Sequence, residues 1–531
     1  MTSLPLKKFI KDGLSSQVKR MDRFNTQVEL RRNKRIQCLS QKRIKTKDDS
    51  WEGYGGARGG AGGEAEEEAE GGEVEPEKER GELEQTIQDA MKEIHSEDIH
   101  LQKKGLKTIN TIVTYYNDDT LEDIVSIMVD LNMLNLGTLL DSDNVDIVYD
   151  ILVILSNAAL SEMAHAVVDH GILEKTITLI QHSTARIRDQ AVWCISNAIG
   201  GNVHLRDTVL SKDEHTTAIK YAIKCAEETE HISNLAWLIC NLCMGNPLPK
   251  TNIVTHFLIP AIGSLWFDNT NAMRTKGDIS YRCLQAIKHL TSRENEYIQL
   301  ALDWAIFPTV FQFLTHLDAP LTIAEACAII VNVASGTAEQ STCVRNTEVW
   351  DMLAAVLTYD LPIKIRQIIE KEMALFLSNV LQDMDNNDPL YCHDLILKVL
   401  SVIPSTSSKV VHESSYVIRV LTLASMSPET TAASAIIRTL LDNGMMMESI
   451  KRIIALPDTT ARLNGLASLV QLCESRYMTR VIAVAEEIKL DQTLIVLSGH
   501  TDAQSQALLN RLFTYFEREE EGDYDDYEYE R

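Results

Sequence analysis

Apolar residues recur at three- and four-residue spacing along most of the chain. In the segment from Ile147 to Leu155, for example, the isoleucines, valines and leucines share one side of a helix. Segments that alternate apolar and polar residues, as a half-buried strand does, are hard to find. The pattern continues with short breaks from about residue 83 to residue 516. It predicts an all-α protein.

One apolar block recurs along this region with an asparagine near its end. The copies are ILVILSNAAL, AVWCISNAIG, LAWLICNLCMG, ACAIIVNVASG and MALFLSNVLQ, with Asn157, Asn197, Asn241, Asn332 and Asn379. The intervals between these positions are 40, 44, 91 and 47 residues, and the longest holds one more copy, YRCLQAIKHLT, with His289 in the asparagine position. A period of about 40–47 residues is typical of HEAT and armadillo units.

A unit of this length holds about three helices and cannot bury its apolar face alone. Stacked units share one long core and form a concave surface. Weaker copies at residues 103–117, 414–423 and 461–472, and a terminal segment at 487–516, extend the array. We therefore expect a right-handed armadillo-repeat superhelical solenoid of about ten repeats, occupying residues 83–516.

The two ends of the chain differ from this body in composition. Residues 1–47 carry fourteen Lys and Arg against three acidic residues, which predicts a disordered basic arm. A Gly- and Glu-rich segment follows at 48–82, where nothing can bury apolar area, and we interpret it as a flexible linker. The last residues, 517–531, form an acidic tail that we expect to be disordered.

Composition and motifs exclude several classes of function. A net charge of −25 argues against direct nucleic-acid binding, and no apolar stretch is long enough for a membrane span. Cys240 and Cys243 form a CxxC, but they lie in an apolar helical block and no second pair stands at zinc spacing. No catalytic motif is present. We therefore expect a protein that is not an enzyme, without metal or cofactor.

Two of the repeated blocks place a tryptophan four residues before the asparagine. These pairs are Trp193 with Asn197 and Trp237 with Asn241, and positions i and i+4 share one helix face. Neighbouring indoles could form slots for the aliphatic stems of Lys or Arg, with cation–π attraction to the charged heads. Asparagine amides can both donate to and accept from an extended peptide backbone. The pattern suits a short basic peptide.

A different interpretation applies to each pair taken singly. A tryptophan on an apolar helix face is more often part of the core, and an asparagine there often forms a hydrogen bond between packed helices. Two pairs in register, 44 residues apart, favour the binding role.

The blocks AVWCISNAIGG, LAWLICNLCMGN and EACAIIVNVASGTAEQ resemble the inner-helix motifs of the importin α family. VELRRNKRIQCLSQKRIK resembles that family's importin β-binding segment, and residues 486–517 resemble its last repeat. The resemblance covers nearly the whole chain in the right order. It implies an adaptor that binds nuclear-localisation peptides, couples them to importin β, and shuttles between cytoplasm and nucleus. A dedicated nuclear export receptor is a further partner that it implies.

The resemblance also assigns residues to roles. It places a major cargo groove at Asn157, Gln190, Trp193, Asn197, Trp237 and Asn241, and a minor groove at Asn332, Glu372 and Asn379. It assigns importin β binding to Arg31, Arg32, Lys34, Arg35, Lys42, Arg43 and Lys45. The last three resemble a cargo peptide, so the arm could fold back into the cargo groove.

The chain departs from the family pattern at several positions. Val153, Gln285, Ala328 and Leu375 stand where other repeats of the family have tryptophan, and Tyr416 and Val420 replace the pair of the eighth repeat. Gly201 replaces an acidic residue that receives a cargo lysine, and Ser161 and Ala166 stand in the slots that help to hold it. The alternative function is an armadillo scaffold that binds other partner segments, with weakened or lost import activity.

Overall fold

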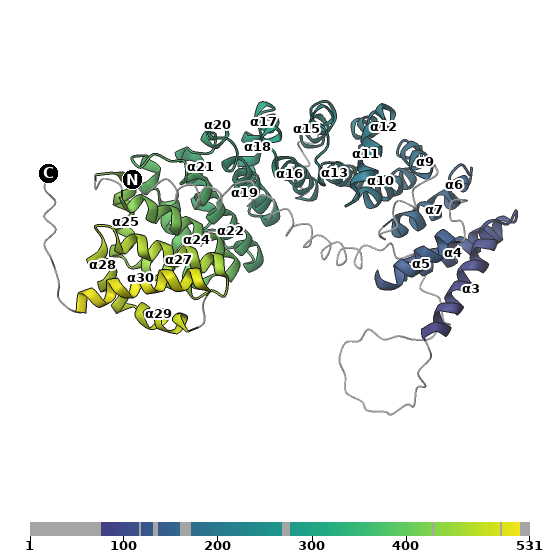
Figure 1. The fold of residues 1–531 in the computed structure, drawn as a ribbon. Helices are drawn as coiled ribbons and strands as arrows, with labels where there is room; N and C mark the ends of the chain where they lie inside the picture. Colours follow the sequence, from purple (N-terminus) through teal and green to yellow (C-terminus); the bar gives the residue numbers. More distant parts are fainter. Residues whose placement is uncertain are drawn as a thin grey trace. The chain divides into compact units, whose positions relative to one another are not determined.

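The computed structural model describes residues 76–115, 118–130, 136–159, 171–267, 277–426, 430–499 and 502–520. Every regular element within these ranges is helical (Figure 1). The helices fall into two compact units that divide between residues 272 and 273, and each is described by itself. We name them the N-terminal and the C-terminal unit. The fold is that of an armadillo-repeat solenoid, which confirms the prediction from periodicity.

The N-terminal unit is built from short and long helices in succession (Figure 1). Its elements are α3 (Pro76–Ile94), α4 (Ile99–Tyr115), α5 (Asp118–Asp130), α6 (Leu136–Leu139), α7 (Val145–Ala158), α9 (Ile172–Leu179), α10 (Ala185–Ile199), α11 (Val203–Ser211), α12 (Asp213–Cys225), α13 (Thr229–Leu242), α14 (Thr251–Ile253), the π-helix η2 (Val254–Leu258) and α15 (Ile259–Phe267).

The C-terminal unit continues the same succession. Its elements are α16 (Gly277–Thr291), α17 (Asn295–Asp303), α18 (Phe307–Gln312), η3 (Phe313–Thr315), α19 (Pro320–Ala334), α20 (Ala338–Thr342), α21 (Thr347–Val356), α22 (Ile363–Val380), η4 (Pro389–Cys392), α23 (Asp394–Val402), η5 (Ile403–Ser405), α24 (Ser408–Leu423), η6 (Ala424–Met426), α25 (Ala432–Asp442), α26 (Met445–Ile454), α27 (Thr459–Cys473), α28 (Met478–Glu487), α29 (Leu490–Ser498) and α30 (Ala503–Glu520).

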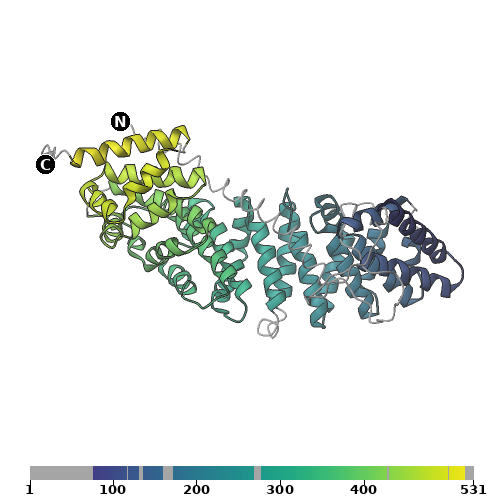
Figure 2. The same cartoon turned by 90° about the horizontal axis from the view of Figure 1, so that it is seen from below.

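The long helix that ends each repeat packs on the corresponding helix of the next repeat. In the N-terminal unit the order of contact is α4, α7, α10 and α13, and in the C-terminal unit it is α16, α19, α22, α24, α27 and α30. Figure 2 shows these helices side by side within each unit. Their apolar faces are buried against one another, as Ile151, Leu155 and Ile195 illustrate. Each buried aliphatic side chain contributes about 1.5–3 kcal/mol, so stability comes from the interfaces between repeats.

Local signals begin several helices where the sequence supplies a cap. The Asn144 side chain accepts a hydrogen bond from the backbone N–H of Asp146 at the start of α7. Asn202 does the same for Leu205 at the start of α11. A polar side chain at this position offsets backbone donors that have no partner within the helix. The caps therefore help to set where α7 and α11 begin.

The helices at the two ends of the array differ in extent from the predicted boundaries. Helix α3 begins at Pro76, inside the segment 48–82 interpreted as linker, and α30 continues to Glu520, beyond residue 516. Proline has no N–H and is therefore well suited to the first turn of a helix. Gly105 of α4 lets α3 approach closely, because a Cβ there would lie 2.5 Å from the carbonyl oxygen of Ala90.

In the described part of the chain, no single helix is both long and apolar enough to cross a bilayer. One helix pair passes by length and composition alone, Asn295–Asp303 with Phe307–Thr315, and it is bent by 86°.

Candidate functional site

Two tryptophans of neighbouring repeats lie against each other in the N-terminal unit. Trp193 comes from α10 and Trp237 from α13, and their ring centroids are 4.7 Å apart with the ring planes inclined by 55°. Both side chains are half-buried, whereas the residues that flank them in sequence, Val192, Cys194, Ala236 and Leu238, are buried. The two indoles therefore form one partly exposed aromatic surface that spans two repeats.

The asparagines of the repeated block hold neighbouring repeats together. Asn197 Nδ2 donates to the carbonyl oxygen of Ser156 at 2.8 Å, and Asn241 Nδ2 donates to that of Ser196 at 2.8 Å. In both cases the acceptor immediately precedes the asparagine of the preceding repeat. These hydrogen bonds link α10 to α7 and α13 to α10.

The same register recurs in the C-terminal unit. Asn332 Nδ2 donates to the carbonyl oxygen of Lys288, which immediately precedes His289, at 3.2 Å and to Thr291 Oγ1 at 3.1 Å. One amide N–H of each of these asparagines thus serves repeat stacking, the role considered as the alternative in the sequence analysis. Their contact with a peptide stays a prediction.

The other predicted groove residues are also buried in helix contacts. Gln190 Nε2 donates to Ser156 Oγ at 2.8 Å, so this side chain joins α10 to α7. Asn157 on α7 is buried, as are Glu372 and Asn379 on α22. Within the described residues, Asn379 Nδ2 has no hydrogen-bond partner. The predicted minor-groove residues therefore lie on two helices that pack together, α19 and α22.

Asn110 of α4 is a member of the asparagine series that the sequence analysis missed. It stands 47 residues before Asn157, within the spacing of the later copies, and is 5% exposed. The spacing could have found it, but the apolar block around Asn110 is shorter than those of the later repeats. The asparagine series therefore extends into the weaker copy that the sequence predicts at residues 103–117.

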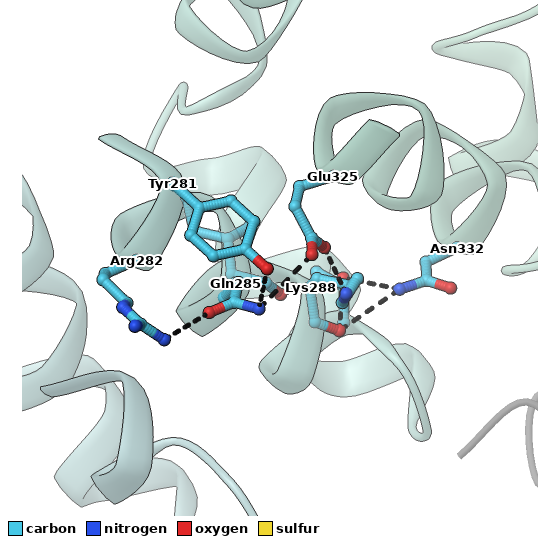
Figure 3. A network of polar contacts seen from close by, with 8 residues as sticks. Tyr281, Arg282, Gln285, Lys288, Glu325 and Asn332 are labelled. Carbon is cyan, nitrogen blue, oxygen red and sulfur yellow. Dashed lines mark hydrogen bonds and ion pairs between the residues drawn. The ribbon is translucent and has the colours of Figure 1, made fainter. Parts of the chain in front are cut away.

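A polar network occupies α16 and α19 in place of aromatic residues (Figure 3). Gln285, which stands in a tryptophan position of the repeat, donates from Nε2 to Tyr281 Oη at 2.9 Å and to Glu325 Oε1 at 3.4 Å. Arg282 donates to Gln285 Oε1 at 3.2 Å. This network joins the second half of α16 to α19 through Gln285 and Glu325, and it is unlike the indole surface of the N-terminal unit.

The centre of this network is a buried ion pair. Lys288 Nζ contacts Glu325 Oε2, and the two side chains are only 9% and 11% exposed (Figure 3). No sequence motif signals the pair, because its members are 37 residues apart and belong to different repeats. Two charges at such low exposure are tolerated because each neutralises the other and the carboxylate also accepts from Gln285.

Gly201 stands where the resemblance places an acidic residue. The backbone conformation at this position favours glycine. Its φ is +96°, a conformation that residues with a side chain rarely adopt, directly after α10 ends. The chain turns sharply here, and a carboxylate is absent. Ser161 and Ala166 lie outside the described residues, as do all the predicted arm residues, Arg31, Arg32, Lys34, Arg35, Lys42, Arg43 and Lys45.

The thiols near the tryptophan pair are poorly suited to nucleophilic chemistry. Burial raises the pKa of Cys194 to about 12, so this thiol is protonated at neutral pH. Cys240 and Cys243 are buried, on and just after α13. Among the described residues no group of three His, Cys, Asp or Glu side chains is placed to hold a metal ion. The arrangement offers a surface for binding.

Comparisons with known proteins agree with this architecture. An importin beta binding domain family matches residues 6–107, and an armadillo/beta-catenin-like repeat family matches residues 161–199. Importin subunit alpha-8 of Arabidopsis thaliana is 26% identical over 219 residues, which cover 41% of this chain and 47% of that relative. Importin subunit alpha-1a of Oryza sativa subsp. japonica is 22% identical over 294 residues, 54% of this chain and 52% of that relative. The two family matches and these relatives together support a member of the importin α family.

The match within the importin α family is distant and partial. The matched part of the chain spans about half the length of these two relatives. Among solved structures, an engineered protein has a TM-score of 0.63 at 17% sequence identity, with 81% of this chain and 99% of that chain covered. At this identity the likeness shows the fold alone.

Proposed function

We propose that this chain is a nuclear-import adaptor that binds basic nuclear-localisation peptides along α7, α10 and α13 and links them to importin β. The Trp193–Trp237 surface is the observation on which the proposal depends. Two partly exposed indoles 4.7 Å apart match the needs of an extended Lys/Arg segment, whose stems pack on aromatic faces while the charged heads gain cation–π attraction.

The predicted major groove is better equipped for this role than the predicted minor groove. In the C-terminal unit the tryptophan positions hold Gln285, Ala328 and Leu375, and the last two are buried. At these three positions no indole stands beside Asn332, Glu372 and Asn379, and the described tryptophan that packs on α22, Trp350, is fully buried. We infer that cargo binds chiefly through the N-terminal unit.

The basic arm is the part of the chain that we assign to importin β. The importin beta binding family match includes all of Arg31 to Lys45. With seven cationic side chains among these fifteen residues, the segment suits an acidic partner surface. Release of cargo and return by an export receptor, with shuttling between cytoplasm and nucleus, complete the proposed cycle. It requires no catalytic chemistry from this chain.

A labelled Lys/Arg-rich import peptide tests the groove. We expect the full-length chain, with or without added importin β, to bind this peptide in a fluorescence anisotropy titration. Replacing both indoles, Trp193→Ala with Trp237→Ala, should weaken binding by at least about thirtyfold, because buried aromatic anchors commonly contribute 2 kcal/mol or more. Circular dichroism checks that the double variant keeps its helices.

The matched control is Trp304→Ala. Trp304 is 46% exposed at the end of α17 in the C-terminal unit, so its loss should leave peptide affinity unchanged. Equal affinity of the wild type and the Trp193/Trp237 double variant contradicts the groove proposal.

A second candidate function is an armadillo scaffold for other partner segments. The Lys288–Glu325 pair favours this scaffold role, because in the C-terminal unit a polar network occupies the positions where a cationic ligand would need an aromatic surface. Failure of the wild-type chain to bind the import peptide, with and without importin β, supports this candidate.

A further inference from the structure

A basic hollow lies in the C-terminal unit, on elements outside the proposed groove. Its volume is about 410 Å³, and it is formed by α25, α28 and the turn after α27. The lining residues are Arg438, Leu441, Asp442, Arg476, Tyr477 and Arg480. Three guanidinium groups and a single carboxylate thus line it, although the whole chain has a net charge of −25, and that carboxylate, of Asp442, pairs with Arg480. Such a surface attracts anionic ligands.

The hollow has an ordered floor and a cationic rim. Tyr477 is buried and its hydroxyl donates to the carbonyl oxygen of Ser434 at 3.3 Å. Arg480 donates to the carbonyl oxygen of Asp442 at 3.2 Å, which fixes α28 to the end of α25. Arg438 and Arg476 are exposed, and the Arg476 guanidinium lies 5.9 Å from the centroid of the Tyr477 ring. Planar guanidinium groups of this kind suit carboxylates.

Helix α30 brings the end of the chain close to this hollow. Tyr515 donates from its hydroxyl to Glu474 Oε1 at 2.8 Å, and Arg511 forms an ion pair with the same carboxylate. Glu474 lies two residues before Arg476, which lines the hollow. These contacts hold the second half of α30, which ends at Glu520, to the turn that supplies Arg476 and Tyr477 to the hollow.

The residues that follow α30 have the complementary composition. The sequence of 521–531 is EGDYDDYEYER, with six carboxylates, three tyrosines and one arginine. Eleven residues reach at most about 36–40 Å when extended. That length suffices to reach the hollow from α30. Carboxylates can pair with the rim arginines, and tyrosine rings can stack on guanidinium groups.

We propose that the acidic segment 521–531 docks in the basic hollow of its own chain, against Arg438, Arg476 and Arg480. Each exposed ion pair contributes little, so docking depends on several pairs at once and on the high effective concentration that the tether creates. The contact is therefore reversible and sensitive to salt. An acidic segment of a partner has to displace the tail before it can use this surface.

A labelled peptide of residues 521–531 tests the docking in low-salt anisotropy titrations. The wild-type full-length chain is compared with a full-length chain whose tail is neutralised by Asp523→Asn, Asp525→Asn, Asp526→Asn and Glu528→Gln. The neutralised chain should bind the peptide about tenfold more tightly, because its own tail no longer competes. Adding Arg438→Ala and Arg476→Ala to it should remove this gain.

The matched control adds Arg452→Ala to the neutralised chain, because Arg452 is an exposed arginine on α26 outside the hollow. It should leave binding unchanged. Docking of the tail in its own chain is overturned if the wild-type and neutralised chains bind the peptide with equal affinity. If replacing Arg438 and Arg476 nevertheless weakens that binding, the hollow binds acidic segments of other molecules. The proposal is also overturned if the peptide still binds after both arginines are replaced, or if it binds to none of the chains. It is likewise overturned if a control peptide with Asn and Gln in place of Asp and Glu binds equally well.

Discussion

At the scale of single residues, Asp150 of α7 is a carboxyl group whose pKa lies well above its usual value. Burial raises its pKa to about 6, and the nearby Asp146 carboxylate adds to the increase. Arg186 and Lys103 oppose it, but both hydrogen-bond to Asp146, which holds the pKa of that group below its usual value. The pKa values of these two carboxyl groups, one helix turn apart, are therefore shifted in opposite directions.

Asp150 should make the N-terminal unit less stable as the pH rises. Its pKa is about 6 in the folded chain and about 3.8 without that environment, so the folded state retains a proton that the unfolded state has released. The protonated Asp150 therefore contributes its full stability below about pH 4, and this contribution is lost as the pH rises from about 4 through 6. By pH 7 the loss is about 1–2 kcal/mol, after allowance for partial exposure.

The variant Asp150→Asn should therefore stabilise the chain at pH 7 and flatten the dependence of its urea midpoint between pH 4.5 and 6.5. Asp143→Asn, at an exposed position before α7, is the control and should keep the wild-type slope. A slope unchanged in Asp150→Asn would show that this carboxyl group is not destabilising.

At the scale of elements, one pair of positions joins successive long helices in both units. Gln190 lies seven residues before Asn197 and bonds to Ser156, while Glu325 lies seven residues before Asn332 and pairs with Lys288. The acceptor Ser156 and the partner Lys288 both immediately precede the asparagine position of their own repeat. The buried ion pair of α16 and α19 thus replaces a neutral hydrogen bond between α7 and α10.

Substitutions can convert the Lys288–Glu325 ion pair into a neutral pair like that of Ser156 and Gln190. Lys288→Ser alone should destabilise the C-terminal unit by about 3–5 kcal/mol, because it leaves the Glu325 carboxylate buried without its cation. Lys288→Ser with Glu325→Gln copies the Ser156–Gln190 pair and should recover more than half of that loss. Hydrogen exchange of α16 and α19 is the measurement, since repeat arrays unfold locally. If the double variant is no better than Lys288→Ser, the two junctions are not equivalent.

At the scale of the whole molecule, charge is separated along the chain. The arm at 1–47 is strongly basic, although the chain as a whole carries −25. Under the proposed function, an arm of this sign competes with a cationic cargo peptide for the groove, and importin β binding and cargo binding are then interdependent.

Deletion of residues 1–47 should abolish capture of the chain by immobilised importin β and strengthen import-peptide binding by about five- to tenfold. The expected gain follows from the proposed competition of Lys42, Arg43 and Lys45 with the peptide for the groove, which the deletion removes. The control, Lys7→Ala with Lys8→Ala and Lys11→Ala, removes basic residues outside 31–45 and should preserve both properties. Capture that persists after the deletion would assign importin β binding to another part of the chain.

The amino-acid sequence by itself determined the class of fold and the register of the indoles. Each repeat carries its own complete helical pattern, and contacts between neighbouring repeats follow from the period of 40–48 residues. The position of Trp193 and Trp237 on one face of two successive helices was therefore predictable, and the structure brings their rings together.

Only the tertiary structure decided which polar residues face the neighbouring repeat. The amides of Asn197 and Asn241 donate across a helix junction, Lys288 meets Glu325, and Asp150 loses enough water to shift its pKa. These outcomes depend on the separation and rotation of helices about 40 residues apart. A helical period specifies the buried face of each helix, whereas the partner of a polar side chain on that face depends on how two helices pack.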